Sequence, residues 1–407
     1  MTVIVCGAGA AGLMAAGTAA KQGCKVVLIE KNGEPGRKLR ITGKGRCNIT
    51  NACDTEDMIG MFPTGGRFLY SALYSFTNQD MLSLLEEYGV KTKVERGGRV
   101  FPVSDNAVDV VKAMKRYALD GDVKLIRGEV KELLIENGRA VGVKTRQGII
   151  KGDAVILATG GASYKNTGSD GYGYTLAKSA GHTITDIVPS LVPLEAEEKW
   201  CRALMGLSLR NVGVTVFDQK GKKIYSGLGE LLFTHFGVSG PLILSASSHM
   251  RRRAAGCVIK IDMKPALAPE QLDARLLRDF ADRQNKHIIN ALDALLPKAL
   301  IPVAIELAGI DLHKSVNVVT RQERIALETV IKGLTLHITG FRPIDEAIIT
   351  SGGVNVKEID PHTMGSKIVS GLYFAGEIID IDGYTGGYNL QAAWSTGHLA
   401  GVSAAMK

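Results

Sequence analysis

The chain has 407 residues, 45% hydrophobic and 22% charged, with a formal net charge of +8. This length suits two or three domains, and no apolar run is long enough to span a bilayer. Six cysteines without a dense framework fit a reducing compartment. We therefore expect a cytoplasmic protein without a signal peptide or a membrane partner. Arg251–Arg253 is a short basic run without interleaved aromatic residues, so we also expect no nucleic-acid partner.

The first thirty residues predict a strand, a glycine turn, a helix and a second strand. An apolar run at 2–6 precedes Gly7-x-Gly9-x-x-Gly12, and a second apolar run ends at Glu30. In such a βαβ unit the glycines allow a tight turn, close approach to a pyrophosphate, and helix packing. The helix N-terminus faces the phosphates, and the acid accepts hydrogen bonds from the adenosine ribose. Because a carboxylate there disfavours a 2′-phosphate, the pattern predicts FAD or NAD rather than NADP.

A basic loop punctuated by glycines follows at residues 31–48. Its cations suit charge-assisted contact with a diphosphate. A simple NAD-binding unit has no obvious use for such a loop, so the loop favours FAD. A solvated basic loop is the alternative interpretation.

Two cysteines, Cys47 and Cys53, lie where flavin disulfide reductases carry a redox pair. Those enzymes have four residues between the two cysteines, whereas this chain has five. Residues five apart on a helix do not share a face, so a disulfide between them would be strained. We predict that these cysteines are not a redox pair.

The middle of the chain changes pattern twice. Residues 123–157 alternate in polarity, which predicts a β-meander ending in a buried strand and a glycine turn at Gly161. The pattern is mainly strand from about 189 and mainly helical from 264. We therefore expect an α/β fold, in which a Rossmann-like FAD-binding domain carries an inserted β-rich domain and a helical cap. The expected ranges are 1–188 and 341–407 for the FAD-binding domain, 189–263 for the β-rich domain, and 264–340 for the cap.

Near the C-terminus, a strand at 371–376 ends in Gly376 and Glu377, followed by a glycine-rich turn and an Ala-rich helix. In flavoproteins the acid at such a strand end binds the ribityl chain. The helix N-terminus then lies at the flavin pyrimidine edge, where its dipole stabilises negative charge. Segments near residues 7, 158 and 376 together predict one bipartite FAD site.

Several long motifs resemble a single family. They lie at 36–51, 158–161, 232–241, 352–364 and 376–391. Together they are similar to the bacterial flavoprotein family that contains aminoacetone oxidase-like and BaiN-like (bile-acid reductase) proteins, over essentially the whole chain. This resemblance implies FAD as the cofactor and the same insertion in a Rossmann-like domain. The FAD-binding residues indicated by the motifs and the resemblance are Gly7, Gly9, Ala11, Gly12, Glu30, Lys31, Arg37, Lys38, Thr42, Asn48, Val130, Gly161, Gly376, Glu377, Asn389 and Leu390.

Three residues are candidates for a proton donor. His235 lies in a glycine-flanked loop that the resemblance would bring towards the flavin; the alternative is that it only holds this loop. Tyr384 and Tyr388 flank the turn at the flavin end, where a phenol either donates a proton or packs. Cys201 and Cys257 show no metal-ligand spacing, so we expect no metal.

These features predict hydride exchange between the flavin and a small-molecule substrate. The preferred hypothesis is reduction of a conjugated C=C bond, which for a BaiN-like protein would belong to a 3-oxo bile-acid enone. No second GxGxxG-type site is present, so NAD(P)H would bind transiently at the flavin face. The alternatives are an oxidase acting on an amine such as aminoacetone, and a non-catalytic FAD-binding regulatory or tRNA-associated protein.

Overall fold

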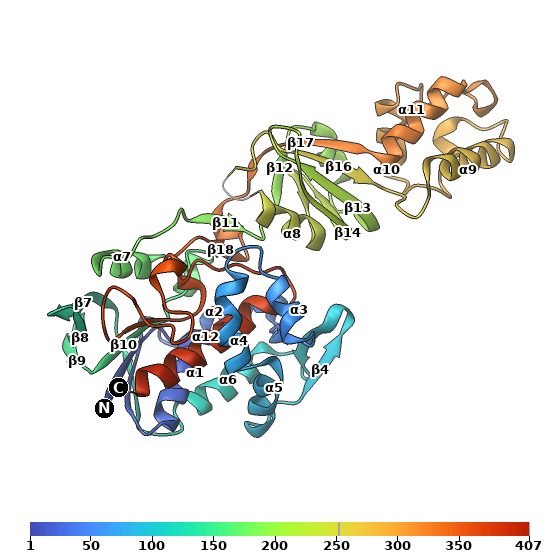
Figure 1. Ribbon diagram of the computed structural model, residues 1–407. Coiled ribbons are helices and arrows are strands. Elements are labelled where there is room, and N and C mark those ends of the chain that lie inside the picture. The colour runs from blue at the N-terminus through green and yellow to red at the C-terminus, as the bar shows by residue number, and fades with distance from the viewer. Residues whose placement is uncertain (251–252, 407) are drawn as a thin grey trace. The chain divides into compact units, whose positions relative to one another are not determined.

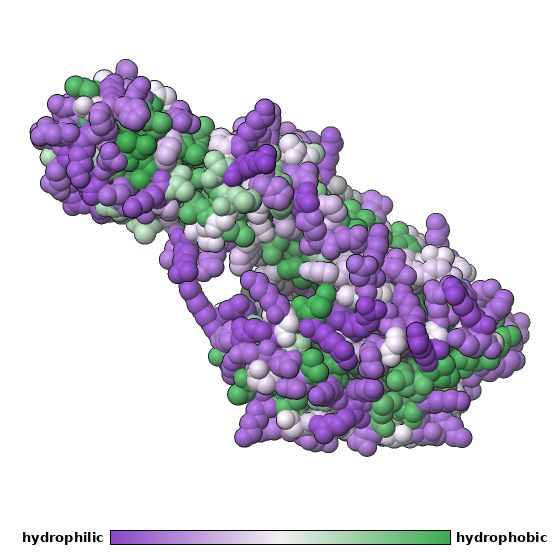
Figure 2. Space-filling view, turned by 180° about the vertical axis from the view of Figure 1, so that it is seen from behind, coloured by the Kyte–Doolittle hydropathy of each residue, from purple (hydrophilic) through white to green (hydrophobic). Residues whose placement is uncertain are grey.

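The computed structural model describes residues 1–250 and 253–406. The chain forms two compact units, one made of residues 1–190 and 343–407 and the other of residues 191–342. Each unit has its own hydrophobic core. On the face shown in Figure 2, hydrophilic side chains cover most of the surface and hydrophobic residues show in small groups between them. No helix in the described ranges is both long and apolar enough to cross a membrane.

A five-stranded parallel sheet, ordered β19-β10-β1-β2-β6, is the centre of the first unit (Figure 1). Its strands other than β6 are mainly apolar, as expected for parallel strands covered on both faces. Helices α1 (Ala10–Lys21) and α12 (Tyr388–Ala405) pack against each other beside the sheet. The strands are β1 (Thr2–Cys6), β2 (Lys25–Glu30), β6 (Val123–Arg127), β10 (Ala154–Leu157) and β19 (Leu372–Phe374).

Small residues allow the two helices to approach closely. A Cβ at Gly397 would lie 2.5 Å from the Ala11 carbonyl oxygen, and one at Gly401 would lie 2.7 Å from that of Ala15. The Ala-rich and Gly-rich composition of both helices is therefore a packing requirement. It fixes the start of α1 against α12.

The remaining elements of the first unit surround this sheet. Residues 123–157 were expected to be one β-meander, but only their central part forms an antiparallel sheet, because β6 and β10 pair with parallel neighbours. The other strands are β3 (Thr50–Asn51), β4 (Thr92–Glu95), β5 (Arg99–Pro102), β7 (Val130–Glu136), β8 (Arg139–Thr145), β9 (Gly148–Lys151), β11 (Val188–Ser190) and β18 (Ile349–Ser351). The other helices are α2 (Arg37–Ile41), α3 (Thr55–Gly60), α4 (Tyr70–Ser75), α5 (Asn78–Glu87), α6 (Ala107–Ala118) and α7 (Tyr172–Ser179).

The second unit is a closed antiparallel barrel, ordered β12-β15-β14-β13-β16-β17, and its described residues also form four α-helices. Its last strand, β17, falls inside the range expected for the helical cap, because Leu334, Leu336 and Ile338 alternate inwards and complete the barrel core. Its strands are β12 (Leu194–Ala196), β13 (Ser208–Phe217), β14 (Lys223–Thr234), β15 (Gly237–Ser239), β16 (Val258–Asp262) and β17 (Leu334–Phe341). Its helices are α8 (Pro241–His249), α9 (Pro269–Ala281), α10 (Leu300–Leu307) and α11 (Arg321–Lys332).

Candidate functional site

The three glycines after β1 differ in whether the surrounding chain leaves room for a side chain. A Cβ at Gly7 would lie 2.5 Å from the Ala158 carbonyl oxygen, and one at Gly12 would overlap the Gly7 carbonyl. Gly9 has an ordinary φ of −79°, and no atom lies within 4 Å of the position of its Cβ. Packing within the chain therefore requires Gly7 and Gly12 but not Gly9. The open space at Gly9 is what a pyrophosphate passing close to the backbone would need.

Glu30 is fixed at the end of β2 and is 9% exposed. One carboxylate oxygen accepts the Ala8 N–H at 2.8 Å, and the other accepts both the backbone N–H (2.8 Å) and the side-chain amide (2.7 Å) of Asn32. A carboxylate can accept about four hydrogen bonds. These three contacts orient it and leave capacity for a ribose hydroxyl.

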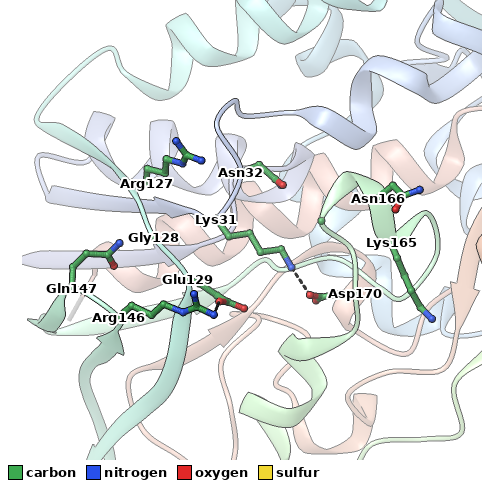
Figure 3. Close-up of a pocket in the computed structure, with 11 residues that line it drawn as sticks. Lys31, Asn32, Arg127, Gly128, Glu129, Arg146, Gln147, Lys165, Asn166 and Asp170 are labelled. Atoms are coloured by element: carbon green, nitrogen blue, oxygen red, sulfur yellow. Dashed lines mark ion pairs between the residues drawn. The ribbon is translucent and has the colours of Figure 1, made fainter.

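A pocket of about 450 Å³ lies beside this strand end (Figure 3). Two ion pairs lie on its wall, Lys31 with Asp170 at 2.8 Å and Arg146 with Glu129 at 3.3 Å. Its size and polar lining fit the adenosine half of a dinucleotide. The lining residues are Lys31, Asn32, Arg127, Gly128, Glu129, Arg146, Gln147, Lys165, Asn166, Gly168 and Asp170.

Glu377, the second predicted acid, lies in a polar cluster built from four segments. The Lys38 ammonium donates to it at 2.6 Å, the Ser163 hydroxyl at 3.2 Å and the Thr350 N–H at 2.9 Å. A Cβ at Gly161 would lie 2.9 Å from its carboxyl carbon. The structure thus brings together Lys38, Gly161 and Glu377, which the motifs predicted separately.

The start of α12 is held by the asparagines of the 36–51 motif. The Asn51 amide donates to the Gly386 carbonyl at 3.1 Å. The Asn48 amide, in the orientation that satisfies both its ends, accepts the Gly387 N–H at 3.0 Å. The first N–H groups of a helix have no partner within it. By holding the start of α12, Asn48 fixes the direction in which these free N–H groups point. The motif therefore positions the helix terminus expected at the flavin pyrimidine edge.

The other predicted cofactor residues lie around these clusters. The Asn389 side chain bonds to Gly383 and Tyr384, which leaves the backbone of Asn389 and of Leu390 for a ligand. A Cβ at Gly376 would lie 2.8 Å from that of Ala11. The remaining contacts are Arg37 donating to Asn32, Thr42 donating to the Leu39 carbonyl, and Val130 beginning β7 next to the pocket residue Glu129.

Sequence patterns missed three residues that hold the Glu377 cluster and the start of α12, and most of the residues that line the pocket. Ser163 and Thr350 complete the Glu377 cluster. They lie far apart in the sequence, and no motif connects them. Asn51 ends the 36–51 motif, and this was the available signal. Only the folded chain shows that it bonds to Gly386.

The proton-donor candidates lie in different units. His235 is an exposed residue of the second unit, between β14 and β15, with its ring edge-on to Phe236 at 5.0 Å. Tyr384 and Tyr388 belong to the first unit, and burial raises the pKa of both phenols, that of Tyr388 to about 12. The Tyr388 hydroxyl is engaged with the Cys53 thiol. All three roles stay predictions.

All six cysteines lie in the described part of the chain, and each is a free thiol. Burial raises the pKa of Cys47 to about 12, and burial is also the main cause that raises the pKa of Cys53. Both are therefore neutral at pH 7, whereas thiol redox chemistry needs a thiolate. Among the described residues, no group of three or more His, Cys, Asp or Glu side chains could hold a metal ion.

We expect Cys47→Ser and Cys53→Ser each to leave flavin reduction and turnover largely intact, because no thiolate takes part. The two-electron-reduced wild type should show no long-wavelength thiolate-to-flavin charge-transfer band in an anaerobic titration. Such a band, together with loss of turnover in both variants, would establish a redox pair.

Comparison with known proteins decides the family. The model of the HI0933-like protein Rossmann domain matches residues 1–403. The chain belongs to this family. The resemblance inferred from the motifs is thereby confirmed, and so is the Rossmann-like fold. The chain is an FAD-dependent oxidoreductase, and its cofactor is FAD.

Three relatives that match nearly the whole chain carry two different names. The 3-dehydro-bile acid delta(4,6)-reductase of Clostridium scindens is 31% identical over 98% of both chains. The ribosomal RNA dihydrouridine synthase of Haemophilus influenzae is 33% identical over 98% of this chain and 97% of the relative. A protein of the same name from Escherichia coli is 30% identical over 97% and 95%.

Solved structures confirm the fold only. The 3-ketosteroid delta1-dehydrogenase of Sterolibacterium denitrificans matches with a TM-score of 0.52 and 14% identity, covering 99% of both chains. The 3-ketosteroid-delta4-(5alpha)-dehydrogenase of Rhodococcus jostii matches with a TM-score of 0.51 and 15% identity, covering 100% of this chain and 96% of that one.

Proposed function

We propose that the chain reduces a carbon–carbon double bond conjugated to a carbonyl group, with NAD(P)H as the electron donor. One observation carries this proposal: relatives matched over nearly their whole length are named for reactions at the same kind of bond. The two double bonds of a delta(4,6) 3-dehydro bile acid, at C4 and C6, are conjugated to the C3 carbonyl. Dihydrouridine differs from uridine by reduction of the C5=C6 bond, which is conjugated to the C4 carbonyl.

The chain's own residues have definite roles in this proposal. Bound FAD supplies hydride exchange with the substrate. Gly9, Glu30 and the pocket would hold the dinucleotide, and Glu377, which Lys38 and Ser163 orient, would bind the ribityl chain. The α12 N-terminus, positioned by Asn48, stabilises negative charge at the flavin pyrimidine edge.

Reduction of a conjugated C=C bond also needs a proton. We assign donation of this proton to Tyr384 ahead of Tyr388. Tyr384 is partly exposed, whereas Tyr388 is buried and its hydroxyl is hydrogen-bonded to Cys53. The Tyr384 phenol carries a proton at neutral pH, as an ordinary tyrosine does, and burial raises its pKa further. His235 is the alternative donor.

Anaerobic mixing experiments test the direction of electron flow. We expect NADH or NADPH to bleach the flavin absorbance of the purified protein, and a 3-oxo bile-acid enone or a uridine-containing RNA to restore it. Product analysis by mass spectrometry should show the addition of two hydrogens. Bleaching by aminoacetone, with recovery only on admitting oxygen, would contradict the proposal and establish the amine-oxidase alternative.

A further inference from the structure

The positive charge of the chain is concentrated in the second unit. Residues 191–342 contain 21 lysines and arginines against 15 aspartates and glutamates, which gives +6 of the chain's +8. This unit carries none of the predicted FAD-binding residues. Its excess charge therefore calls for an explanation other than the cofactor.

Part of this charge gathers where β13 and β14 meet. Lys220, Lys222 and Lys223 are exposed in and beside the connecting turn. The carboxylate of Asp218 accepts the backbone N–H groups of Lys220 and Lys222, both at 2.9 Å. It therefore serves to hold the turn together, and it makes no ion pair with these lysines.

Strand register adds an aromatic ring and a further cation. Phe217 pairs with Lys223 on β14, and Thr215 pairs with Lys260 on β16. Paired residues and residues two apart share one face of a sheet, so Phe217, Lys223 and Lys260 face the same side. The Lys260 ammonium lies 5.6 Å from the centre of the Phe217 ring.

The chain before β16 is tied to the same place. The Gln219 amide donates to the carbonyls of Arg253 (3.0 Å) and Ala255 (2.8 Å), which brings exposed Arg253 beside the turn. Arg251 and Arg252 lie outside the described residues. We call the set Phe217, Lys220, Lys222, Lys223, Arg253 and Lys260 the cationic tip. Within the described residues, none of its five cations makes an ion pair.

We propose that the cationic tip binds the phosphate backbone of RNA, with Phe217 as a stacking surface for a base. The inference rests on the proposed function, because a uracil ring in RNA then carries the double bond that is reduced. Cations around an aromatic ring are the combination that single-stranded nucleic acids need. A membrane surface would need several exposed apolar side chains that insert, and Phe217 is the one apolar member of the tip.

The linear sequence led to the opposite expectation, because no aromatic residue is interleaved with Arg251–Arg253. The barrel instead assembles the ring and the cations from β13, β14, β16 and the segment before β16. The absence of a nucleic-acid partner remains a prediction, and the experiment below tests it against the proposal.

The test is binding of a short fluorescein-labelled, uridine-rich RNA to the holoprotein, measured by anisotropy across a range of salt concentrations. In one variant Lys222, Lys223 and Lys260 are all changed to Ala. We expect binding about tenfold to a hundredfold weaker, and a slope of log affinity against log salt that is smaller by about 2. Phe217→Leu keeps apolar volume without a stacking plane, and should weaken binding about fivefold or more.

The matched control changes Lys112, Lys124 and Lys178, exposed lysines of the first unit, to Ala. It should bind RNA with nearly the wild-type salt dependence. Equal RNA binding by the tip variant and the control would overturn the proposal. The proposal would also be overturned if the tip variant kept its RNA binding and lost only its binding to vesicles of phosphatidylserine and phosphatidylcholine. Reduction of the flavin by NADH or NADPH in the absence of RNA needs no tip contact, so its failure in the wild type would count against the proposed function alone.

Discussion

A Gly9→Val variant is expected to fold normally and to lose FAD. The ordinary φ of Gly9 and the open space around its Cβ mean that the chain itself tolerates a side chain there. A pyrophosphate does not, because the valine occupies the space through which it must approach the backbone. A displaced pyrophosphate would lose its hydrogen bonds to the backbone N–H groups at the start of α1. If two are lost, each worth about 1.5–3 kcal/mol, FAD affinity should fall by about a hundredfold or more.

Flavin fluorescence titration of the apoprotein measures this affinity, and thermal unfolding of the apoprotein measures the fold. Gly33→Val is the matched control, since Gly33 is exposed, in the loop after Glu30, and also has no atom within 4 Å of its Cβ position. The control should keep wild-type FAD affinity. Wild-type affinity in Gly9→Val would show that the dinucleotide does not cross this turn.

A Gly387→Ala variant is expected to be the least stable of the single substitutions considered. Gly387 has φ 100°, and a Cβ there would overlap the backbone of Thr50. The left-handed backbone costs about 1–2 kcal/mol for a non-glycine residue. The new Cβ would also push Thr50 away from α12 and break the contact between Asn48 and Gly387. We therefore expect the free energy of unfolding to fall by about 3 kcal/mol or more in total.

Urea denaturation gives the change in the free energy of unfolding, and the released FAD reports on the site. Gly23→Ala separates the two causes, because Gly23 has φ 84° but open space around its Cβ. This control should lose only the backbone contribution, about 1–2 kcal/mol. If both variants lose the same stability, the close approach of Thr50 to α12 has no energetic role.

Local pattern was enough for the dinucleotide-binding opening. The apolar runs at 2–6 and 25–29 form β1 and β2, and Glu30 ends the second strand as predicted. These elements are determined by neighbouring residues, since each apolar run is continuous and is bounded by turn residues. Pairing partners were less predictable: β6 alternates in polarity like an antiparallel strand, yet it pairs in parallel with β2.

Contacts between segments that are distant in the sequence could not be predicted from local patterns. Lys38 and Glu377 were each predicted to bind FAD for separate reasons, and their ion pair across 339 positions follows only from the packing of the sheet. Thr350 carries no motif, yet its hydroxyl accepts the Ala162 N–H at 2.8 Å and so shapes the same turn. The cationic tip has the same origin, because strand register creates it.

The identity of the cofactor carried by the purified protein tests the central claim most directly. We propose that Glu30 and the pocket beside it hold the adenosine and that the Glu377 cluster holds the flavin end. The protein should therefore be yellow, and acid extraction followed by chromatography should recover FAD. Recovery of FMN, or a colourless protein that takes up no FAD on reconstitution, would contradict the account.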